Sequence, residues 1–379
     1  MRKFELIATA AMGLESIVAK EVRDLGYECT VDNGKVLFSG DVKAIAKANM
    51  WLRTADRIKI KVGEFKAYTF DELFEKTKAI PWEHYLPENA EFPVSGKSLK
   101  SKLFSVSDCQ AIVKKAIVER LKRAYSRTSW FEENGPLFKI EVAILKDVVT
   151  LTLDTSGAGL HKRGYRAEQG EAPLKETLAA ALIQLTNWNP DKPFVDPFCG
   201  SGTIPIEAAM IGQNIAPGFN REFISETWPW IPTEVWEDIR IEAEDVAKYD
   251  QPIDISGFDI DHRMVEMAKA NSFEAGFADI INFKQMQAKD FTTKKEYGVI
   301  VGNPPYGERI GEKDVVEQLY RDLGQVYAKL DTWSIYILTS DENFEHLYGR
   351  QATKKRKLFN GFIKTDYYQY WGKRPPRIE

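Results

Sequence analysis

The chain has 379 residues, of which 44% are hydrophobic and 28% are charged. This length corresponds to two or three domains, and the composition is typical of a globular protein. The formal net charge of -4 excludes a uniformly basic nucleic-acid binder but is compatible with a basic surface on one domain. No run of 18 apolar residues is present, so the sequence predicts no membrane-spanning helix.

Charge is divided unevenly along the chain. Residues 1–155 hold 25 Lys and Arg against 22 Asp and Glu, a net +3, whereas residues 156–379 hold 27 against 34, a net -7. The two parts are therefore expected to do different work. The three cysteines and four histidines are widely scattered, which argues against disulfides and against a metal cluster and favours a reducing, cytoplasmic location.

The first part alternates short strands and helices, an α+β pattern. An Ile-Val-rich hairpin is expected near its end, because two alternating runs flank Lys146 and Asp147. Strands are predicted over 3–9, 35–38, 57–62, 91–95, 138–145 and 148–154, and helices over 14–25, 41–50, 70–79 and 107–125.

A linker rich in Gly and charged residues is expected over 155–173, and the pattern then changes. The repeated strand–helix order that follows predicts a parallel, doubly wound α/β sheet. At its end, Asn360-Gly361 lies between two β-rich runs, which is a strong hairpin signal. Helices are predicted over 174–187, from Thr203, and over 262–275, with strands before 196, over 255–261 and 281–284, and before 303.

The first chemical motif is DPFCGSGT, residues 196–203. Gly200 and Gly202 allow a tight turn between a strand and a helix, and the helix N-terminus can then present free N–H groups to a ligand. The spacing differs from GxGxxG, and no Lys-Ser/Thr follows, so dinucleotide-binding and P-loop readings fit poorly. Cys199 could be a methylation nucleophile, but its place inside the loop favours a small packed side chain.

The second motif is GFDID, residues 257–261. A carboxylate at the end of the second strand can accept both hydroxyls of a ribose, and Asp259 is best placed for this, whereas Asp261 better fits a helix N-cap. The separation from the glycine loop is nearer 60 residues than the usual 20. An insertion over about 213–250, with Trp228, Trp230 and Trp236, accounts for the difference and is either a lid or a packing element.

Two further motifs follow strands. KDF (289–291) could place an acid near an adenine amino group, although an exposed loop acid is the commoner case. NPPYG (303–307) is more specific: Asn303 before a proline is held extended, and Pro304 and Pro305 stiffen the loop. An amide oxygen and a proline carbonyl can accept both hydrogens of an exocyclic amino group while Tyr306 stacks on its base, which suits methyl transfer to that nitrogen.

Together these motifs resemble those of class I S-adenosylmethionine-dependent methyltransferases that modify amino groups. GLHKRGYR (159–166), APLKETLAAA (172–181), DPFCGSGTIPIEAAM (196–210) and NPPYGER (303–309) look like the THUMP-containing RNA guanine-N2 methyltransferases, and most like the 23S rRNA enzymes that form the N-terminal half of a long bifunctional enterobacterial protein. ATAAMGLESIVAKEV (8–22) and WLRTADRI (51–58) extend the resemblance to the first part.

The resemblance implies three regions. These are a ferredoxin-like portion (1–42), a THUMP-like RNA-binding domain (43–155) and a Rossmann-like, seven-stranded methyltransferase domain with a C-terminal antiparallel hairpin (156–379). It also implies S-adenosylmethionine as cofactor, no metal, and RNA as partner, either 23S rRNA, a ribosome-assembly intermediate or tRNA.

The resemblance further assigns roles by position. The catalytic loop is Asn303, Pro304, Pro305 and Tyr306. Cofactor contacts are expected from four places. The segment before the first strand contributes Lys175, Glu176 and Thr177, and the glycine loop contributes Asp196, Pro197, Gly200, Gly202 and Thr203. The ribose is expected at Asp259 and Ile260, and the adenine at Asp290 and Phe291.

Basic residues gather between 97 and 127, where nine Lys and Arg face only Asp108 and Glu119. In the helix, Ile112, Val113, Ala116, Ile117 and Leu121 are expected to point inward, leaving cations outward for phosphates or for solvent. KKRK (354–357) carries the same ambiguity. The candidate RNA contacts are Lys97, Lys100, Lys102, Lys115, Lys122, Arg123, Lys162, Arg163 and Arg166.

Three functions remain open from the sequence. The first is guanine-N2 methylation of 23S rRNA, or of tRNA. The second is adenine-N6 methylation of DNA, since an NPPY loop serves that chemistry too. The third is a non-catalytic RNA-binding factor, which the four retained pocket motifs disfavour.

Overall fold

The computed structural model describes residues 2–166, 174–307 and 313–376. The end of the expected linker (167–173) and the last two residues of NPPYGER lie outside these ranges. Within them, no helix has both the length and the apolarity needed to cross a membrane. The chain divides into two compact units: one formed by Met1–Ala10, Val18–Leu160 and Arg221–Glu242, the other by Ala11–Ile17, His161–Asn220 and Ala243–Glu379.

The first unit is built on one seven-stranded sheet with the order β2-β3-β1-β4-β7-β6-β5. All neighbouring strands are antiparallel except β5 and β6. The long strand β4 pairs with β1 through its first half and with β7 through its second, so a single sheet joins the two expected N-terminal regions. The strands are β1 (Phe4–Ala10), β2 (Cys29–Asp32), β3 (Lys35–Gly40), β4 (Ala55–Lys66), β5 (Val94–Leu99), β6 (Ile140–Leu145) and β7 (Val148–Asp154).

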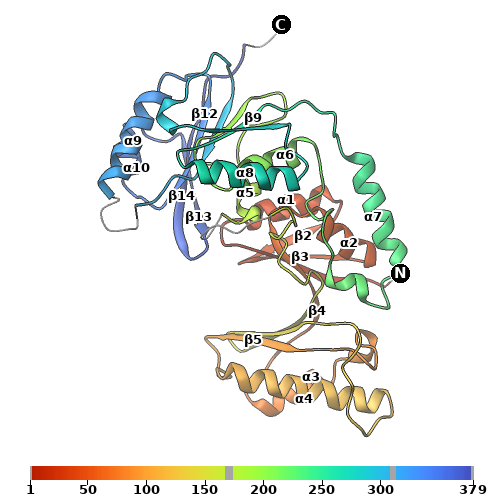
Figure 1. Ribbon diagram of the computed structural model, residues 1–379. Coiled ribbons are helices and arrows are strands. Elements are labelled where there is room, and N and C mark those ends of the chain that lie inside the picture. Colours follow the sequence, from red (N-terminus) through yellow and green to blue (C-terminus); the bar gives the residue numbers. More distant parts are fainter. Residues whose placement is uncertain (1, 167–173, 308–312, 377–379) are drawn as a thin grey trace. The chain divides into compact units, whose positions relative to one another are not determined.

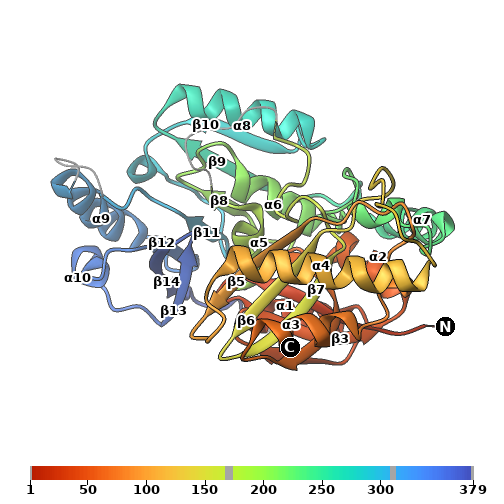
Figure 2. The same cartoon turned by 90° about the horizontal axis from the view of Figure 1, so that it is seen from below.

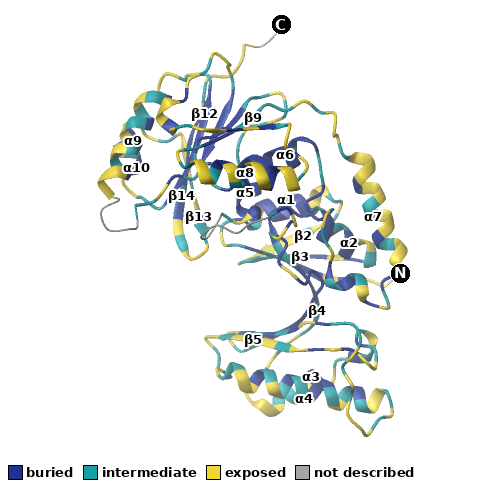
Figure 3. Cartoon of the chain, viewed as in Figure 1, coloured by how far each residue is buried: buried dark blue, intermediate teal, exposed yellow. Residues whose placement is uncertain are grey.

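The helices of this unit follow from apolar positions at helical spacing. In α4, four of the five residues predicted to point inward are buried, Val113, Ala116, Ile117 and Leu121, whereas Ile112 is half-buried. The polar face of α4 is exposed (Figure 3). Figure 2 shows α3 and α4 running across β5, β6 and β7. The helices are α1 (Glu15–Asp24), α2 (Val42–Trp51), α3 (Phe70–Lys78), α4 (Val106–Ala124) and α7 (Thr233–Val246), with short 3₁₀ turns at Trp82–His84 and Ile224–Thr227.

The tryptophan-rich insertion packs into the first unit. Trp228 donates a hydrogen bond from Nε1 to the Leu137 carbonyl (2.9 Å) and stacks on Phe138, with ring centroids 4.5 Å apart. Trp230 donates to the Tyr85 carbonyl (2.9 Å). These aromatic contacts bury apolar surface and satisfy the indole N–H groups. Of the two readings left open by the sequence, residues 221–242 therefore act as a packing element of this unit.

The second unit contains the predicted doubly wound sheet, with the order β10-β9-β8-β11-β12-β14-β13 (Figure 1). The first five strands in this order, β10, β9, β8, β11 and β12, are parallel. β14 and β13 add an antiparallel hairpin at one edge, so the predicted fold class is confirmed. The strands are β8 (Phe194–Asp196), β9 (Ile255–Asp259), β10 (Ile281–Gln285), β11 (Val299–Gly302), β12 (Ser334–Thr339), β13 (Lys354–Asn360) and β14 (Ile363–Tyr370).

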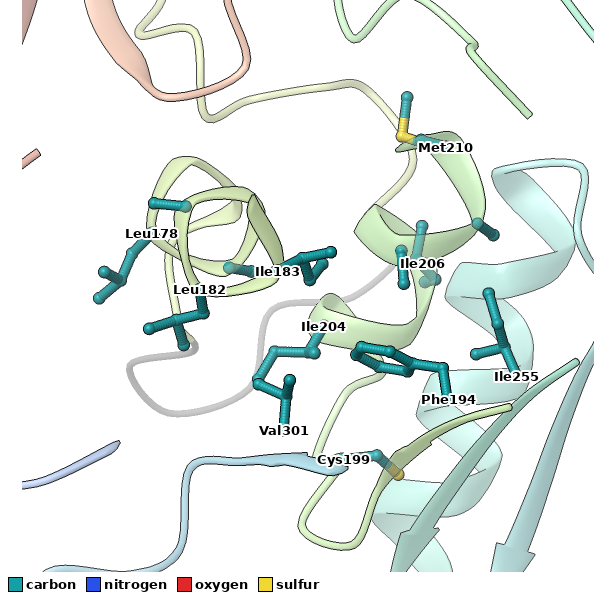
Figure 4. Close-up of a cluster of buried hydrophobic side chains, with 14 of the residues drawn as sticks. Leu178, Leu182, Ile183, Phe194, Cys199, Ile204, Ile206, Met210, Ile255 and Val301 are labelled. Carbon is teal, nitrogen blue, oxygen red and sulfur yellow. The ribbon is translucent and has the colours of Figure 1, made fainter. Parts of the chain in front are cut away.

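Helices cover both faces of this sheet. Alternate strand residues face opposite cores: Val299 and Val301 pack in one cluster and Ile300 in the other. In Figure 4, Ile183 of α5, Ile206 of α6 and Phe194 of β8 gather between the helices and the sheet. The helices are α5 (Glu176–Gln184), α6 (Thr203–Gly212), α8 (His262–Glu274), α9 (Lys313–Tyr327) and α10 (Phe344–Tyr348), with a 3₁₀ turn, η3, at Ala288–Asp290.

Candidate active site

The second unit contains a cavity of about 970 Å³ where β8, β9 and β11 end. This is the edge of the sheet at which ligands bind in doubly wound folds, because β9 and β11 lie on opposite sides of β8 and their connections diverge there. The glycine loop, Asp259 and the Asn303–Tyr306 loop all contribute to its wall. Three motifs spread over about 110 residues of sequence therefore share one site, as predicted.

The glycine loop turns from β8 into α6 with two left-handed residues, Gly200 at φ +50° and Gly202 at φ +87°. A side chain at Gly202 would lie 3.0 Å from the Ala268 Cβ, so this glycine permits close packing of α6 against α8. A side chain at Gly200 would meet nothing within 4 Å. Gly200 lies on the cavity wall, and its missing side chain leaves room for a ligand against the backbone.

Asp259 holds this loop in place. Its carboxylate accepts hydrogen bonds from the Gly200 N–H (3.0 Å) and from the Asp261 N–H (2.9 Å). Each carboxylate oxygen has a second lone-pair site, so capacity for two further hydrogen bonds remains toward the cavity. Asp261 caps α8 by accepting from the Arg263 N–H (2.9 Å), as expected of this residue from the sequence.

Asp196, at the end of β8, is buried on the cavity wall and accepts a hydrogen bond from the Phe198 N–H (3.0 Å). Burial, together with the nearby Asp259 charge, raises the pKa of Asp196 to about 8. The same burial raises the pKa of the Cys199 thiol well above its usual range. A thiol held neutral in this way is a poor nucleophile, so Cys199 serves packing.

The raised pKa of Asp196 makes a testable prediction. Between the pKa of the unfolded chain, about 3.8, and that of the folded chain, about 8, the folded state holds a proton that the unfolded state has lost. Raising the pH through this window therefore destabilises the fold, by up to about 1.4 kcal/mol per pH unit. Urea unfolding of the wild type and of Asp196→Asn at pH 5 to 8 should show their difference in stability changing with this sign. A pH-independent difference would contradict the assignment.

The Asn303–Tyr306 loop follows β11 and is held from two sides. The Tyr320 hydroxyl, on α9, donates to the Pro305 carbonyl (3.0 Å). The Tyr306 hydroxyl donates to Asn303 Oδ1 (2.6 Å), and Asn360 Nδ2 donates to the Tyr306 oxygen (3.3 Å). Asn360 lies at the end of β13 and also lines the cavity. The sequence indicated only a turn at this position, because its neighbours on the wall come from distant segments.

The segment before β8 is tied to the glycine loop by Arg166. Its guanidinium donates to the Glu176 carboxylate, to the Leu174 carbonyl (2.9 Å) and to Thr203 Oγ1 (2.9 Å). Leu174 and Thr203 line the cavity, together with Pro197 and Ile260. Four other predicted cofactor residues are not among those that line the cavity: Lys175, at the N-terminus of α5, is exposed, and Glu176, Thr177 and Gly202 are buried.

Asp290 and Phe291, the predicted adenine contacts, are not among the residues that line the cavity. β10 ends at Gln285, and the turn η3 follows. Phe291 is buried between Phe258 and Trp333, with centroid distances of 5.7 and 5.6 Å, and Asp290 is exposed. Gln287, Ala288 and Lys289 reach the cavity instead.

Arg163 also needs correction as an RNA contact. Its side chain is 1% exposed and forms a buried ion pair with Glu207, whose side chain is fully buried. Tyr165 donates to the same carboxylate (3.2 Å). Arg166 is likewise engaged within the unit, whereas Lys162 is exposed. HKRGYR therefore contributes mainly to the structure of the second unit.

The basic run of the first unit is partly neutralised. Lys114, Arg120 and Arg127 form ion pairs with Glu133, Glu83 and Glu88, which lie outside the run in sequence. Among the predicted contacts, Lys97 pairs with Glu141 and Lys122 with Glu119, whereas four have exposed side chains with no ion pair within the described residues: Lys100, Lys102, Lys115 and Arg123. Two exposed aromatic residues that sequence reasoning missed, Phe104 (81%) and Trp130 (91%), flank α4 in the chain.

Comparison with known proteins now decides the family. Residues 163–369 match the model of the RMKL-like methyltransferase domain, residues 5–59 match the RlmL ferredoxin-like domain, and residues 67–154 match the THUMP domain. The chain belongs to the RMKL-like methyltransferase family. The predicted recognition is thereby confirmed at the level of a THUMP-containing methyltransferase.

Three relatives of this methyltransferase have full-length similarity. YpsC of Bacillus subtilis, named a candidate RNA methyltransferase, is 68% identical over 100% of this chain and 98% of its own length. A Listeria monocytogenes structure, described as a predicted N6-adenine-specific DNA methylase, is 66% identical with a TM-score of 0.95, covering 98% of this chain and 97% of its own. SMU.472, a candidate methyltransferase in complex with SAH, is 54% identical with a TM-score of 0.96, covering 99% and 100%.

Proposed function

We propose that the chain transfers a methyl group from S-adenosylmethionine to the exocyclic N2 of a guanine in RNA, with 23S rRNA as the first substrate to test. The observation that carries the proposal is the Asn303–Tyr306 loop on the wall of the cavity that also holds the glycine loop and Asp259. RNA as the substrate is supported by the THUMP match and by the name of YpsC. S-adenosylmethionine is supported by the SAH complex of SMU.472.

The cavity fits this cofactor in size and chemistry. Its volume, about 970 Å³, lies at the upper end of the range for small-molecule sites. Asp259 has acceptor capacity for the two ribose hydroxyls, and the open face of Gly200 allows close approach to the loop. When bound, S-adenosylmethionine supplies an electrophilic methyl group on a sulfonium centre.

The chain's own residues then position the amino group. Asn303 Oδ1 and the Pro304 carbonyl accept the two N2 hydrogens, which turns the nitrogen lone pair toward the methyl group. Tyr306 stacks on the base. The Tyr306 hydroxyl donates to Asn303 Oδ1 at 2.6 Å, and the second lone pair of this oxygen is the one proposed to accept from the entering base.

The experiment is methylation with labelled cofactor of unmodified 23S rRNA, tRNA and DNA, followed by nucleoside mass spectrometry. N2-methylguanosine in 23S rRNA is the expected product. N2-methylguanosine only in tRNA would identify tRNA as the substrate in place of 23S rRNA. N6-methyladenine only in DNA would support the description given to the Listeria relative. A calorimetric titration without cofactor binding would favour a non-catalytic RNA-binding factor.

Asp259→Ala is expected to weaken S-adenosylmethionine binding by at least about 10- to 100-fold, because each hydrogen bond to a charged acceptor contributes about 1.5–3 kcal/mol. Isothermal titration calorimetry measures the change. The matched control is Asp261→Ala, two residues along, which removes the α8 cap and lowers stability by about 1 kcal/mol. Equal losses of affinity in both variants would contradict a direct role for Asp259.

A further inference from the structure

The tip of the β13–β14 hairpin carries an unusually exposed aromatic residue. Asn360 pairs with Ile363, so Gly361 and Phe362 form the two-residue turn, with Gly361 at φ +63°. Phe362 is 106% exposed, the highest value among the large hydrophobic residues described. Its ring therefore contributes nothing to the packing of the unit. A single exposed aromatic residue is common on protein surfaces, so its position must carry the argument.

That position is beside the catalytic loop. Asn360 lines the cavity and donates a hydrogen bond to the Tyr306 hydroxyl (3.3 Å). Phe362 follows two residues later, which places its backbone within about 7 Å of Asn360. Phe362 is therefore close in the chain to a residue that contacts the Tyr306 hydroxyl.

The strands behind this tip are basic. β13 is the edge strand of the sheet, and its register places Lys355, Lys357 and Lys364 on one face, with Asp366 directly opposite Lys357. Lys355 pairs with Glu345 (2.8 Å), so Lys357 and Lys364 are the cations of this face considered below. Within the described residues Lys357 forms no ion pair, and Lys364 contacts only Glu342, at 3.6 Å and with both side chains at least half exposed. Exposed pairs of this kind are weak and are readily exchanged for a phosphate.

An exposed aromatic ring next to exposed cations is the combination that binds unpaired nucleotides, because every base offers a π-face and every nucleotide a phosphate. We propose that the β13–β14 hairpin is an RNA-contacting arm, in which Phe362 stacks on a nucleotide adjacent to the target base and Lys357 and Lys364 contact its phosphates. The inference rests on the proposed function and adds to it an RNA contact within the catalytic unit itself.

The hairpin is also connected to the Asn303–Tyr306 loop by hydrogen bonds. Asn360 connects the tip to Tyr306, and Tyr306 connects to Asn303, in one chain of hydrogen bonds. A nucleotide held on Phe362 would therefore be positioned from the element that also orients the catalytic loop. This arrangement would align the neighbouring base for entry, without contributing to cofactor binding.

The test compares Phe362→Ala and Phe362→Trp with the wild type in RNA affinity, measured by fluorescence anisotropy on a single-stranded oligoribonucleotide of mixed sequence, and in kcat/KM. Phe362→Ala should lower both by about 5- to 150-fold, the range of one base–aromatic stack, and Phe362→Trp should restore them. Lys357→Gln and Lys364→Gln should each reduce the salt dependence of log affinity by about 0.7. Binding of S-adenosylmethionine should stay unchanged in all variants.

The matched control is Phe273→Ala, the same substitution at a 69% exposed phenylalanine on α8. Phe273 lies roughly 13 Å further along the helix than Met264, which lines the cavity. Wild-type affinity and kcat/KM in Phe362→Ala, or equal losses in Phe273→Ala, would overturn the hairpin proposal alone. Absence of a methylated RNA product with the wild type would overturn the proposed function. The affinity measurement would still test whether the hairpin binds RNA.

Discussion

Asn303→Ala is expected to lower kcat for RNA methylation by about 10²- to 10³-fold and to leave the dissociation constant of S-adenosylmethionine unchanged. The amide oxygen is a fixed acceptor at the end of β11, and the loop around it is held by Tyr320 through the Pro305 carbonyl. Removing the acceptor therefore removes the alignment of the amino group without moving the cofactor wall. Single-turnover kinetics and calorimetry separate the two effects.

A second variant distinguishes the acceptor from the stacking ring. Tyr306→Phe keeps the ring and loses only the hydroxyl that donates to Asn303 Oδ1. We expect at most about a tenfold loss, because one hydrogen bond contributes about 0.5–1.5 kcal/mol. Near wild-type kcat in Asn303→Ala would refute the proposed chemistry, whatever Tyr306→Phe shows.

Glu207→Ala is expected to lower the free energy of unfolding of the second unit by about 3–5 kcal/mol. Glu207 Oε1 and Oε2 accept from Arg163 Nε (3.3 Å) and from a terminal guanidinium nitrogen (3.2 Å). Both side chains are buried, so the variant would leave a positive charge in a site closed to water. Urea denaturation followed by circular dichroism measures the loss.

Two controls define the cause. Arg163→Met combined with Glu207→Leu removes both charges at similar volume and should recover most of the stability. Glu266→Ala breaks the ion pair with Lys269, in which both side chains are about half exposed, and should cost less than about 1 kcal/mol. A loss in Glu207→Ala no larger than that in Glu266→Ala would show that the buried pair contributes little.

Much of the site could be predicted from local patterns. Asp196 and Asp259 end apolar strands, and Asn303 directly follows one. Pro197 and Gly200 come after Asp196, and two prolines come after Asn303, so the φ angles there are restricted by Pro or freed by Gly. Such turn chemistry acts over a few residues and is readable without the fold. The parallel order of the strands then brings their carboxyl ends to one edge, as the cavity confirms.

Other roles depend on partners far away in the chain. Arg163 resembles a phosphate contact until Glu207, 44 residues later, is placed beside it. Phe291 follows Asp290, the acid predicted to contact adenine, but the burial of its ring against Trp333 depends on the path of the chain after β10 ends at Gln285. The count of cations between 97 and 127 likewise overstates the free charge, because Glu83 and Glu133 lie outside that window.

By itself, the sequence determined the doubly wound sheet, its hairpin and the three loops that form the cavity, because these arise from apolar periodicity and from turn residues a few positions apart. Only the tertiary structure decided which charges are neutralised, that Asn360 joins the catalytic loop, and that the tryptophan-rich insertion packs on the first unit. These outcomes depend on the burial and pairing of side chains distant in sequence. The free energy of a side-chain pair depends on how far the fold removes both partners from water. A local sequence pattern does not contain this information, because the partners are far apart in the chain.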